Sequence, residues 1–228
     1  MSGKVYFTML RKDEAKAREI FFQLRNYGLN PQGHFWKDDL KNMAWAASRN
    51  DLQDTRTKAW LIYGQKEDWF SPSIRQGLSL LFLCKRPDLN VIVLTSDKDG
   101  LTGDDLPFVW SGVHLVGLSE GFVPKVVAKV HLPAKKRNLP YRVVPHPVPG
   151  LGLWMEVAPS EGEWQGILIG ARKAEIKHLG IGEEGRLPEK STLEYPVRDM
   201  KIEVEGQEFV AWAVQNRLNQ GVSAFVNL

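Results

Sequence analysis

The stretch GQKEDWFSPS, residues 64–73, places side chains capable of chemistry beside a typical helix start. Ser71 offers a hydroxyl that can accept an unpaired backbone N–H, and Pro72 lacks the N–H that would be left over at the first helical position. The free N–H groups and the dipole of such a helix favour a phosphate or a carboxylate. We therefore predict an anion-binding site at Ser71 and Ser73, joined by Arg11.

Two predicted elements position this stretch. The run AWLIY at residues 59–63 is short and apolar and is stopped by Gly64, which predicts a buried strand. A helix is predicted at 72–85 and ends before Pro87. In an open sheet of parallel strands, ligands bind beyond the carboxyl ends of the strands. Residues 64–73 lie at such an end.

Strands and helices alternate through the rest of the first half of the chain. Further strands are predicted at 4–10, 33–36, 90–95 and 113–118, and further helices at 13–27, within 38–53 and at 124–130. This alternation is typical of a parallel sheet whose strands are joined by right-handed crossovers. The first half is therefore predicted to be an α/β domain.

The pattern changes after residues 131–150, a segment with five prolines and a basic cluster that we interpret as a junction between domains. Short strands without helical periodicity follow at 153–157, 166–171, 174–179, 200–205, 209–216 and 222–227. Strands of this length and spacing indicate a small antiparallel sandwich or barrel. We predict domains at 1–138 and 147–228.

The order of KVYFTML, EAKAREIFFQLRNYGL, GHFW, AWLIYG, SPSIRQGLSLLFL and NVIVLT resembles the TIR-like branch of the flavodoxin-like folds over residues 4–131. The resemblance implies a flavodoxin-like or TIR-like parallel sheet with helices on both faces. It also implies a binding or signalling role through contacts with a protein partner, without enzymatic activity. This is the function that we predict.

An enzymatic alternative follows from the same resemblance. TIR-like enzymes that release nicotinamide from NAD use a glutamate on the helix after the third strand. Here residues 69–87 contain no Asp or Glu, and Glu67 and Asp68 precede that helix. The alternative is therefore a nucleotide-processing enzyme such as an NAD N-glycosidase, with Glu67 or Asp68 as the catalytic carboxylate and a nucleotide as the ligand.

The sequence offers no motif for a metal or a cofactor. Its five histidines show no HxH or HExxH spacing, and the single cysteine, Cys84, cannot build a zinc site. GIGEEG at 180–185 matches the dinucleotide-binding pattern, but Pro188 stands where the required helix would run. We interpret this motif as a glycine-rich hairpin loop.

The charge is distributed unevenly between the halves. The net charge of +3 divides into +7 for residues 1–150, from 22 Lys and Arg against 15 Asp and Glu, and −4 for residues 151–228. A basic patch is predicted at Lys125, Lys129, Lys135, Lys136 and Arg137, and leaves a nucleic-acid-associated accessory protein as a third hypothesis. No aromatic residue interleaves this cluster to stack on bases, which argues against nucleic acid.

The sequence also indicates where the protein acts. The N-terminus MSGKVYFTML lacks the long apolar region of a signal peptide, and no stretch approaches the ~20 apolar residues that a membrane span requires. The single cysteine fits a reducing compartment. We therefore predict a cytoplasmic protein that does not bind membranes.

Overall fold

The computed structural model describes residues 3–96, 100–110, 112–134 and 139–228. Internal contacts divide the chain into two compact units, Met1–Arg137 and Asn138–Leu228. The second unit therefore begins within the segment that the sequence pattern assigned to a junction. Within the described ranges, no helix is long and apolar enough to cross a bilayer.

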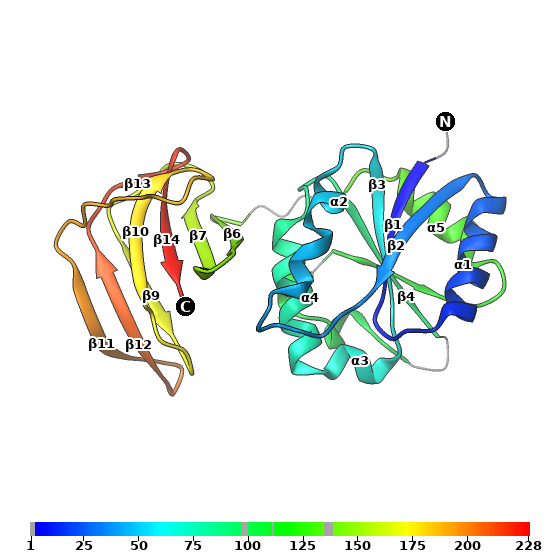
Figure 1. Cartoon of the computed structure of the whole chain (residues 1–228), viewed down its shortest axis with the longest axis horizontal. Helices are drawn as coiled ribbons and strands as arrows, with labels where there is room; N and C mark the ends of the chain where they lie inside the picture. Colours follow the sequence, from blue (N-terminus) through cyan, green and yellow to red (C-terminus); the bar gives the residue numbers. More distant parts are fainter. Residues whose placement is uncertain (1–2, 97–99, 111, 135–138) are drawn as a thin grey trace. The chain divides into compact units, whose positions relative to one another are not determined.

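The first unit is built on a five-stranded parallel sheet with the order β2-β1-β3-β4-β5 (Figure 1). The order 2-1-3-4-5 is that of flavodoxin-like folds. Every neighbouring pair in the sheet is parallel. The strands are β1 (Gly3–Met9), β2 (Leu29–Phe35), β3 (Thr57–Tyr63), β4 (Asn90–Thr95) and β5 (His114–Gly117).

Helices cover both faces of this sheet. One face carries the first and last helices, and α4 and its neighbours lie over the other face (Figure 1). The α-helices are α1 (Glu14–Asn26), α2 (Arg49–Gln53), α3 (Lys66–Phe70), α4 (Pro72–Cys84) and α5 (Phe122–His131), and the 3-10 helices are η1 (Ala44–Ser48), η2 (Gly103–Asp105) and η3 (Phe108–Trp110).

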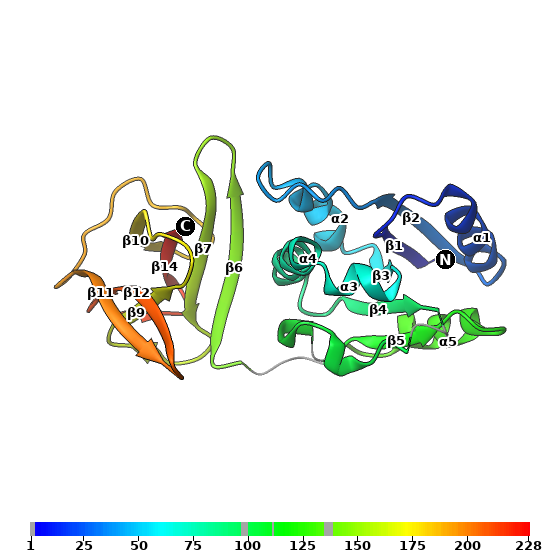
Figure 2. The same cartoon turned by 90° about the horizontal axis from the view of Figure 1, so that it is seen from below.

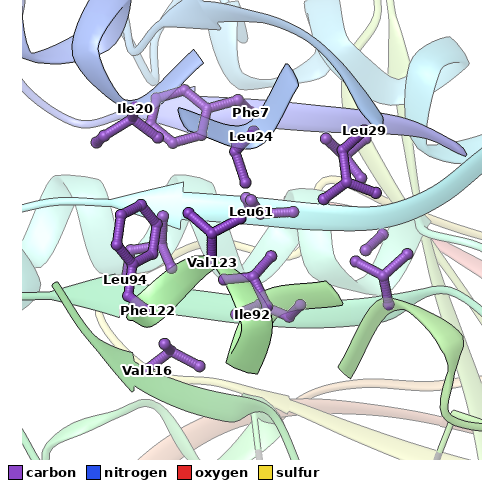
Figure 3. Packing of buried hydrophobic residues seen from close by; sticks show 14 of the residues in the cluster. Phe7, Ile20, Leu24, Leu29, Leu61, Ile92, Leu94, Val116, Phe122 and Val123 are labelled. Atoms are coloured by element: carbon purple, nitrogen blue, oxygen red, sulfur yellow. The ribbon is translucent and has the colours of Figure 1, made fainter. Parts of the chain in front are cut away.

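The two faces of the sheet are packed differently. Beneath α1 and α5, aliphatic strand residues such as Leu61 and Ile92 meet Leu24 and Val123 in one cluster (Figure 3). On the other face aromatic rings meet, with Trp60 and Trp110 centroids 5.7 Å apart and Phe82 stacked on Trp110 at 5.0 Å. Burial on both faces explains the nearly continuous apolar strands.

The second unit contains two antiparallel sheets. The larger has the order β6-β7-β14-β13-β8, with β10 also pairing β14, and the smaller has the order β11-β12-β9. The long β6–β7 hairpin is clear in Figure 2. The strands are β6 (Tyr141–Val148), β7 (Gly152–Pro159), β8 (Glu163–Trp164), β9 (Ile167–Ala171), β10 (His178–Glu183), β11 (Val197–Val204), β12 (Gln207–Val214), β13 (Leu218–Asn219) and β14 (Val222–Asn227).

Residues from both sheets form one core in the second unit. Trp212 and Val214 of the smaller sheet pack in the same cluster as Leu179, Ala224 and Val226 of the larger sheet. An α/β unit with a parallel sheet, followed by antiparallel sheets, confirms the predicted fold class.

Two predicted elements differ from the structure in the first unit, and one helix of the structure was not predicted. The second strand begins at Leu29 and not at residue 33, because Pro31 is tolerated on the edge strand β2, whose outer side needs no backbone donor. The helix predicted within 38–53 is reduced to η1 and α2, since Met43 adopts a left-handed conformation with φ 52°. The helix α3 was not predicted.

Two predictions for the second unit are also corrected. Residues 141–148, placed in the junction, form strand β6, and its Pro145 and Pro147 are accommodated because β6 lies at the sheet edge. The strand predicted at 174–179 is β10, which starts at His178. Part of the GIGEEG motif therefore lies in a strand, and Pro188 packs against Gly180 and Gly182.

Candidate functional site

The first candidate site is the edge where β1 and β3 end. The strand order reverses between these neighbours, and such a point is where open α/β sheets bind ligands. Here the side chain of Leu10 is buried against Gly64, and a Cβ added to Gly64 would lie 2.5 Å from Leu10 Cδ1. The Leu10 side chain therefore occupies part of the space between the two strand ends.

Asp68 at this edge is held by hydrogen bonds to both of its carboxylate oxygens. Oδ1 accepts from Arg11 Nε at 2.5 Å, and Oδ2 accepts from the backbone N–H of Gln65 at 2.9 Å. The Gln65 side chain in turn accepts from Arg11 Nη1 at 3.0 Å. Asp68 is buried, whereas Glu67 is exposed on the first turn of α3. Asp68 therefore caps α3 and fixes Arg11.

Ser71 and Ser73 meet at the start of α4. Their hydroxyl oxygens are 3.1 Å apart, and Ser73 Oγ donates to Asp38 Oδ2 at 2.5 Å. Ser71 makes no side-chain cap hydrogen bond to the helix. A carboxylate of the chain thus lies beside the predicted anion site, while Arg11 is engaged by Asp68. Binding of an external anion by Ser71, Ser73 and Arg11 stays a prediction.

A second candidate site is an open pocket of about 570 Å³ between α1 and the edge strand β2. Its lining includes the aromatic residues Phe21, Phe22 and Phe35 together with Glu14, Arg18 and Arg25. We call it the α1–β2 pocket. It joins aromatic surface to charge, as expected of a binding surface and not of a packed core.

Charge in the α1–β2 pocket is only partly compensated. Arg18 Nη2 lies 3.0 Å from Glu14 Oε2, an exposed pair one helical turn apart. Arg25 lies with its guanidinium carbon 6.0 Å from the centre of the Phe21 ring, and no described carboxylate is within ion-pair distance of it. Phe22 is 66% exposed. The pocket therefore offers an apolar wall and a cation without an internal counterion.

The basic patch is only partly described. Lys125 and Lys129 lie one turn apart on α5, with Lys125 exposed and Lys129 half-buried. Lys135, Lys136 and Arg137 fall outside the described residues. The two lysines that can be placed do not amount to a phosphate-binding groove.

A polar cluster at the second and first strands involves His34. Tyr6 donates its hydroxyl to Ser48 Oγ at 2.9 Å, and His34 Nδ1 lies 2.9 Å from the Tyr6 oxygen. Burial lowers the pKa of His34, an effect opposed by the charge of Asp51. This cluster ties η1 to the sheet.

The second unit contains a buried charge cluster that the sequence analysis did not identify. Glu156 on β7 is 1% exposed, and its Oε1 accepts from Arg142 Nη1 at 2.7 Å, Ser223 Oγ at 2.7 Å and the Gly185 N–H at 3.1 Å. Its Oε2 lies 2.7 Å from His146 Nε2. We call these five residues the Glu156 network.

The electrostatics of the Glu156 network follow from its hydrogen bonds. Burial by itself raises the pKa of the Glu156 carboxyl, but the bonds from His146, Ser223, Arg142 and Gly185 lower it to about 2. Both oxygens of the carboxylate accept hydrogen bonds from the second unit, three at Oε1 and one at Oε2. This arrangement ties β6 to β7 and β14, and the carboxylate is buried from solvent.

The spacing on β6 is a signal that could have revealed this network. The register places Glu156 opposite Val144, so Arg142 and His146, two residues to either side, lie on the same face. The pattern is an Arg and a His four residues apart on one strand, with a single Glu opposite them in the neighbouring apolar strand. The prolines of residues 131–150 obscured it.

Among the described residues, no three His, Cys, Asp or Glu side chains are grouped as a metal site. Comparison with models of known protein families and with curated proteins finds no match to this chain, so no residue role is transferred to it from a relative.

Proposed function

We propose that the first unit is a binding module that acts through protein contacts, as expected of a TIR-like domain, and that the α1–β2 pocket is its contact surface. The exposed ring of Phe22 beside Arg25 carries this proposal. An exposed aromatic side chain lacks the favourable free energy that its burial would give. Aromatic and arginine side chains also dominate the binding energy of protein interfaces.

The pocket favours a segment with an apolar anchor next to an acidic group. The three phenylalanines provide a surface for an aliphatic or aromatic side chain, and Arg25 provides a partner for a carboxylate. A pocket of about 570 Å³ falls in the size range of ligand pockets, so it has room for the side chains of a short segment. We therefore expect short acidic, apolar peptides to bind.

The enzymatic alternative receives less support from the geometry. Cleavage of a glycosidic bond needs a carboxylate close to the developing positive charge on the sugar. Each carboxylate oxygen of Asp68 accepts a hydrogen bond, one from Arg11 and the other from the backbone of Gln65. Glu67 is exposed on the first turn of α3. Neither carboxylate lines the α1–β2 pocket.

The test is selection of peptides from a random display library on the full-length protein. Bound peptides are counter-selected on the variant Phe22→Ser, which removes the exposed ring. Tyr27→Ser is the matched control, because Tyr27 is also exposed, at the C-terminal cap of α1, but does not line the pocket. We expect enriched peptides with an apolar residue beside Asp or Glu, and at least a tenfold loss of affinity for Phe22→Ser alone.

Two outcomes would overturn the proposal. The first is the absence of enriched peptides, and the second is equal binding to the wild type and to Phe22→Ser. Release of nicotinamide from NAD by the purified protein, lost in Glu67→Gln or Asp68→Asn, would favour the enzymatic alternative.

A further inference from the structure

The smaller sheet of the second unit has a mostly apolar outer face. Residues directly opposite each other in antiparallel strands share a face, and the register opposes Ile202 to Phe209 and Met200 to Ala211. Ala211 in turn opposes Gly170, and Ala213 opposes Leu168, on β9. We call the face of these residues, with Val204, the outer face.

The other face of the same sheet packs in the core of the second unit. Trp212, Val214, Ile167 and Ile169 point there and belong to the core of the second unit. On the outer face, by contrast, Leu168 is 53% exposed and Val204 is 52% exposed. Met200, Ile202 and Phe209 on this face are partly exposed and Ala211 is buried, so the face is partly open to solvent, and exposed apolar side chains of this kind mark interaction sites.

Strand β11 is one of the two edge strands of this sheet. Its neighbour β12 follows through the turn Glu205-Gly206, where both residues have positive φ, 51° and 73°, as in a type I′ hairpin. In such a hairpin the two residues that flank the turn, Val204 and Gln207, form a hydrogen-bonded pair. Away from the turn, non-hydrogen-bonded and hydrogen-bonded pairs alternate, so Glu203 and Lys201 are both in non-hydrogen-bonded pairs with β12. The backbone N–H and C=O groups of Lys201 and Glu203 therefore point away from β12.

An antiparallel partner on this edge must pair with those outward groups. For a second copy of β11, three registers bring Lys201 and Glu203 into hydrogen-bonded positions. One places Lys201 opposite Lys201 and another places Glu203 opposite Glu203, and both are opposed by like charge. The third, centred on Ile202, places each Lys201 opposite the Glu203 of the other copy.

We propose that β11 pairs with β11 of a second copy of this chain, antiparallel about Ile202. In this register the outer face also matches, since Met200 lies opposite Val204 of the second copy and Ile202 lies opposite its own equivalent. The pairing joins two three-stranded sheets into one of six strands with a continuous apolar face. Charged residues on an edge strand usually block pairing, but here they select one register.

The pairing has a limited length. A register irregularity between Val197 and Met200 ends the regular part of β11, and the turn begins after Val204. The interface therefore spans Met200–Val204 and is small compared with that of a permanent dimer. We expect a dimer that forms reversibly as the concentration rises. This surface is separate from the α1–β2 pocket, and neither proposal depends on the other.

Sedimentation equilibrium of the full-length protein tests the pairing. We expect the apparent mass to rise with concentration towards twice the 25.9 kDa of one chain. Lys201→Glu and Glu203→Lys should each stay monomeric, because each places like charges opposite one another in the proposed register. Circular dichroism should show that both variants are folded, since both side chains are exposed.

Mixing provides the decisive control. An equimolar mixture of Lys201→Glu and Glu203→Lys should recover the dimer, because the two variants have complementary charges in the proposed register. The double variant Lys201→Glu/Glu203→Lys should dimerise with itself and not with the wild type. A wild type that stays monomeric, single variants that dimerise like the wild type, or a mixture that stays monomeric would each overturn the proposal.

Discussion

Replacing Glu156 by Gln should destabilise the second unit, because it removes the charge to which Arg142 and His146 are bound. Gln keeps the shape of the side chain, and its carbonyl oxygen can still accept the hydrogen bonds made to Oε1. What is lost is the charge-assisted part of the bonds from β6. Arg142 is left partly buried without its nearest counterion.

The size of the effect follows from the pKa. A carboxyl whose pKa falls from 4.5 to about 2 on folding gains roughly 3 kcal/mol in the ionised form. Arg142 is 26% exposed, and solvent screening there reduces the expected loss to about 2 kcal/mol. For a unit of this size, that corresponds to a decrease in Tm of roughly 8–16 °C.

The pH dependence has a defined sign. Because the folded pKa lies below the unfolded value, the folded state binds fewer protons, and the contribution of Glu156 is complete above pH 4.5. It is lost as the pH falls from 4.5 towards 2. The difference in Tm between the wild type and Glu156→Gln should therefore shrink over this interval.

Thermal unfolding of the full-length protein, followed by near-UV circular dichroism, measures the change. Glu161→Gln is the matched control, since Glu161 is exposed in the same unit. A Tm for Glu156→Gln within 2 °C of the wild type at pH 7 would refute the reasoning. So would a difference between the two proteins that does not change between pH 5 and pH 2.5.

Three further predictions concern the first unit. Gly33→Ala should destabilise it by about 3 kcal/mol in urea unfolding, because the added Cβ would lie 1.9 Å from the carbonyl oxygen of Phe7 on β1. Gly3→Ala is the control and should be tolerated, because its Cβ would make ordinary contacts at 3.7 Å. Asp68→Asn should lower the Tm and Glu67→Gln should not, since only the former removes an ion pair, the one with Arg11. The lowered pKa of His34 means that acidification below pH 6.5 destabilises the folded state, so His34→Gln should reduce the loss of Tm between pH 7.5 and pH 5.5.

The alternation of elements in the first half was predictable because it rests on local patterns. Strands such as residues 59–63 and 90–95 are covered on both faces, so nearly every residue is apolar and the signal is strong. The helix from Pro72 was predicted for the same reason, since its start depends on residues next to one another in the chain.

Elements that depend on position in the sheet could not be predicted from local patterns. Strands β2 and β6 contain prolines, which argue against a strand until the sheet order shows that both lie at edges. The fragmentation of the helix within 38–53 depends on the left-handed conformation of Met43. The period of the sequence does not encode that conformation.

The sequence by itself determined which residues are available for chemistry and on which kind of element they lie. The tertiary structure decided which of them are engaged. Arg11 and Asp68 are 57 residues apart in the chain, and their contact arises because β1 and β3 are neighbours in the sheet. Ion pairs and shared sheet faces depend on distances across the fold, and strand order and register set those distances. The periodicity of buried residues depends only on neighbours along the chain, so the sequence alone reveals it.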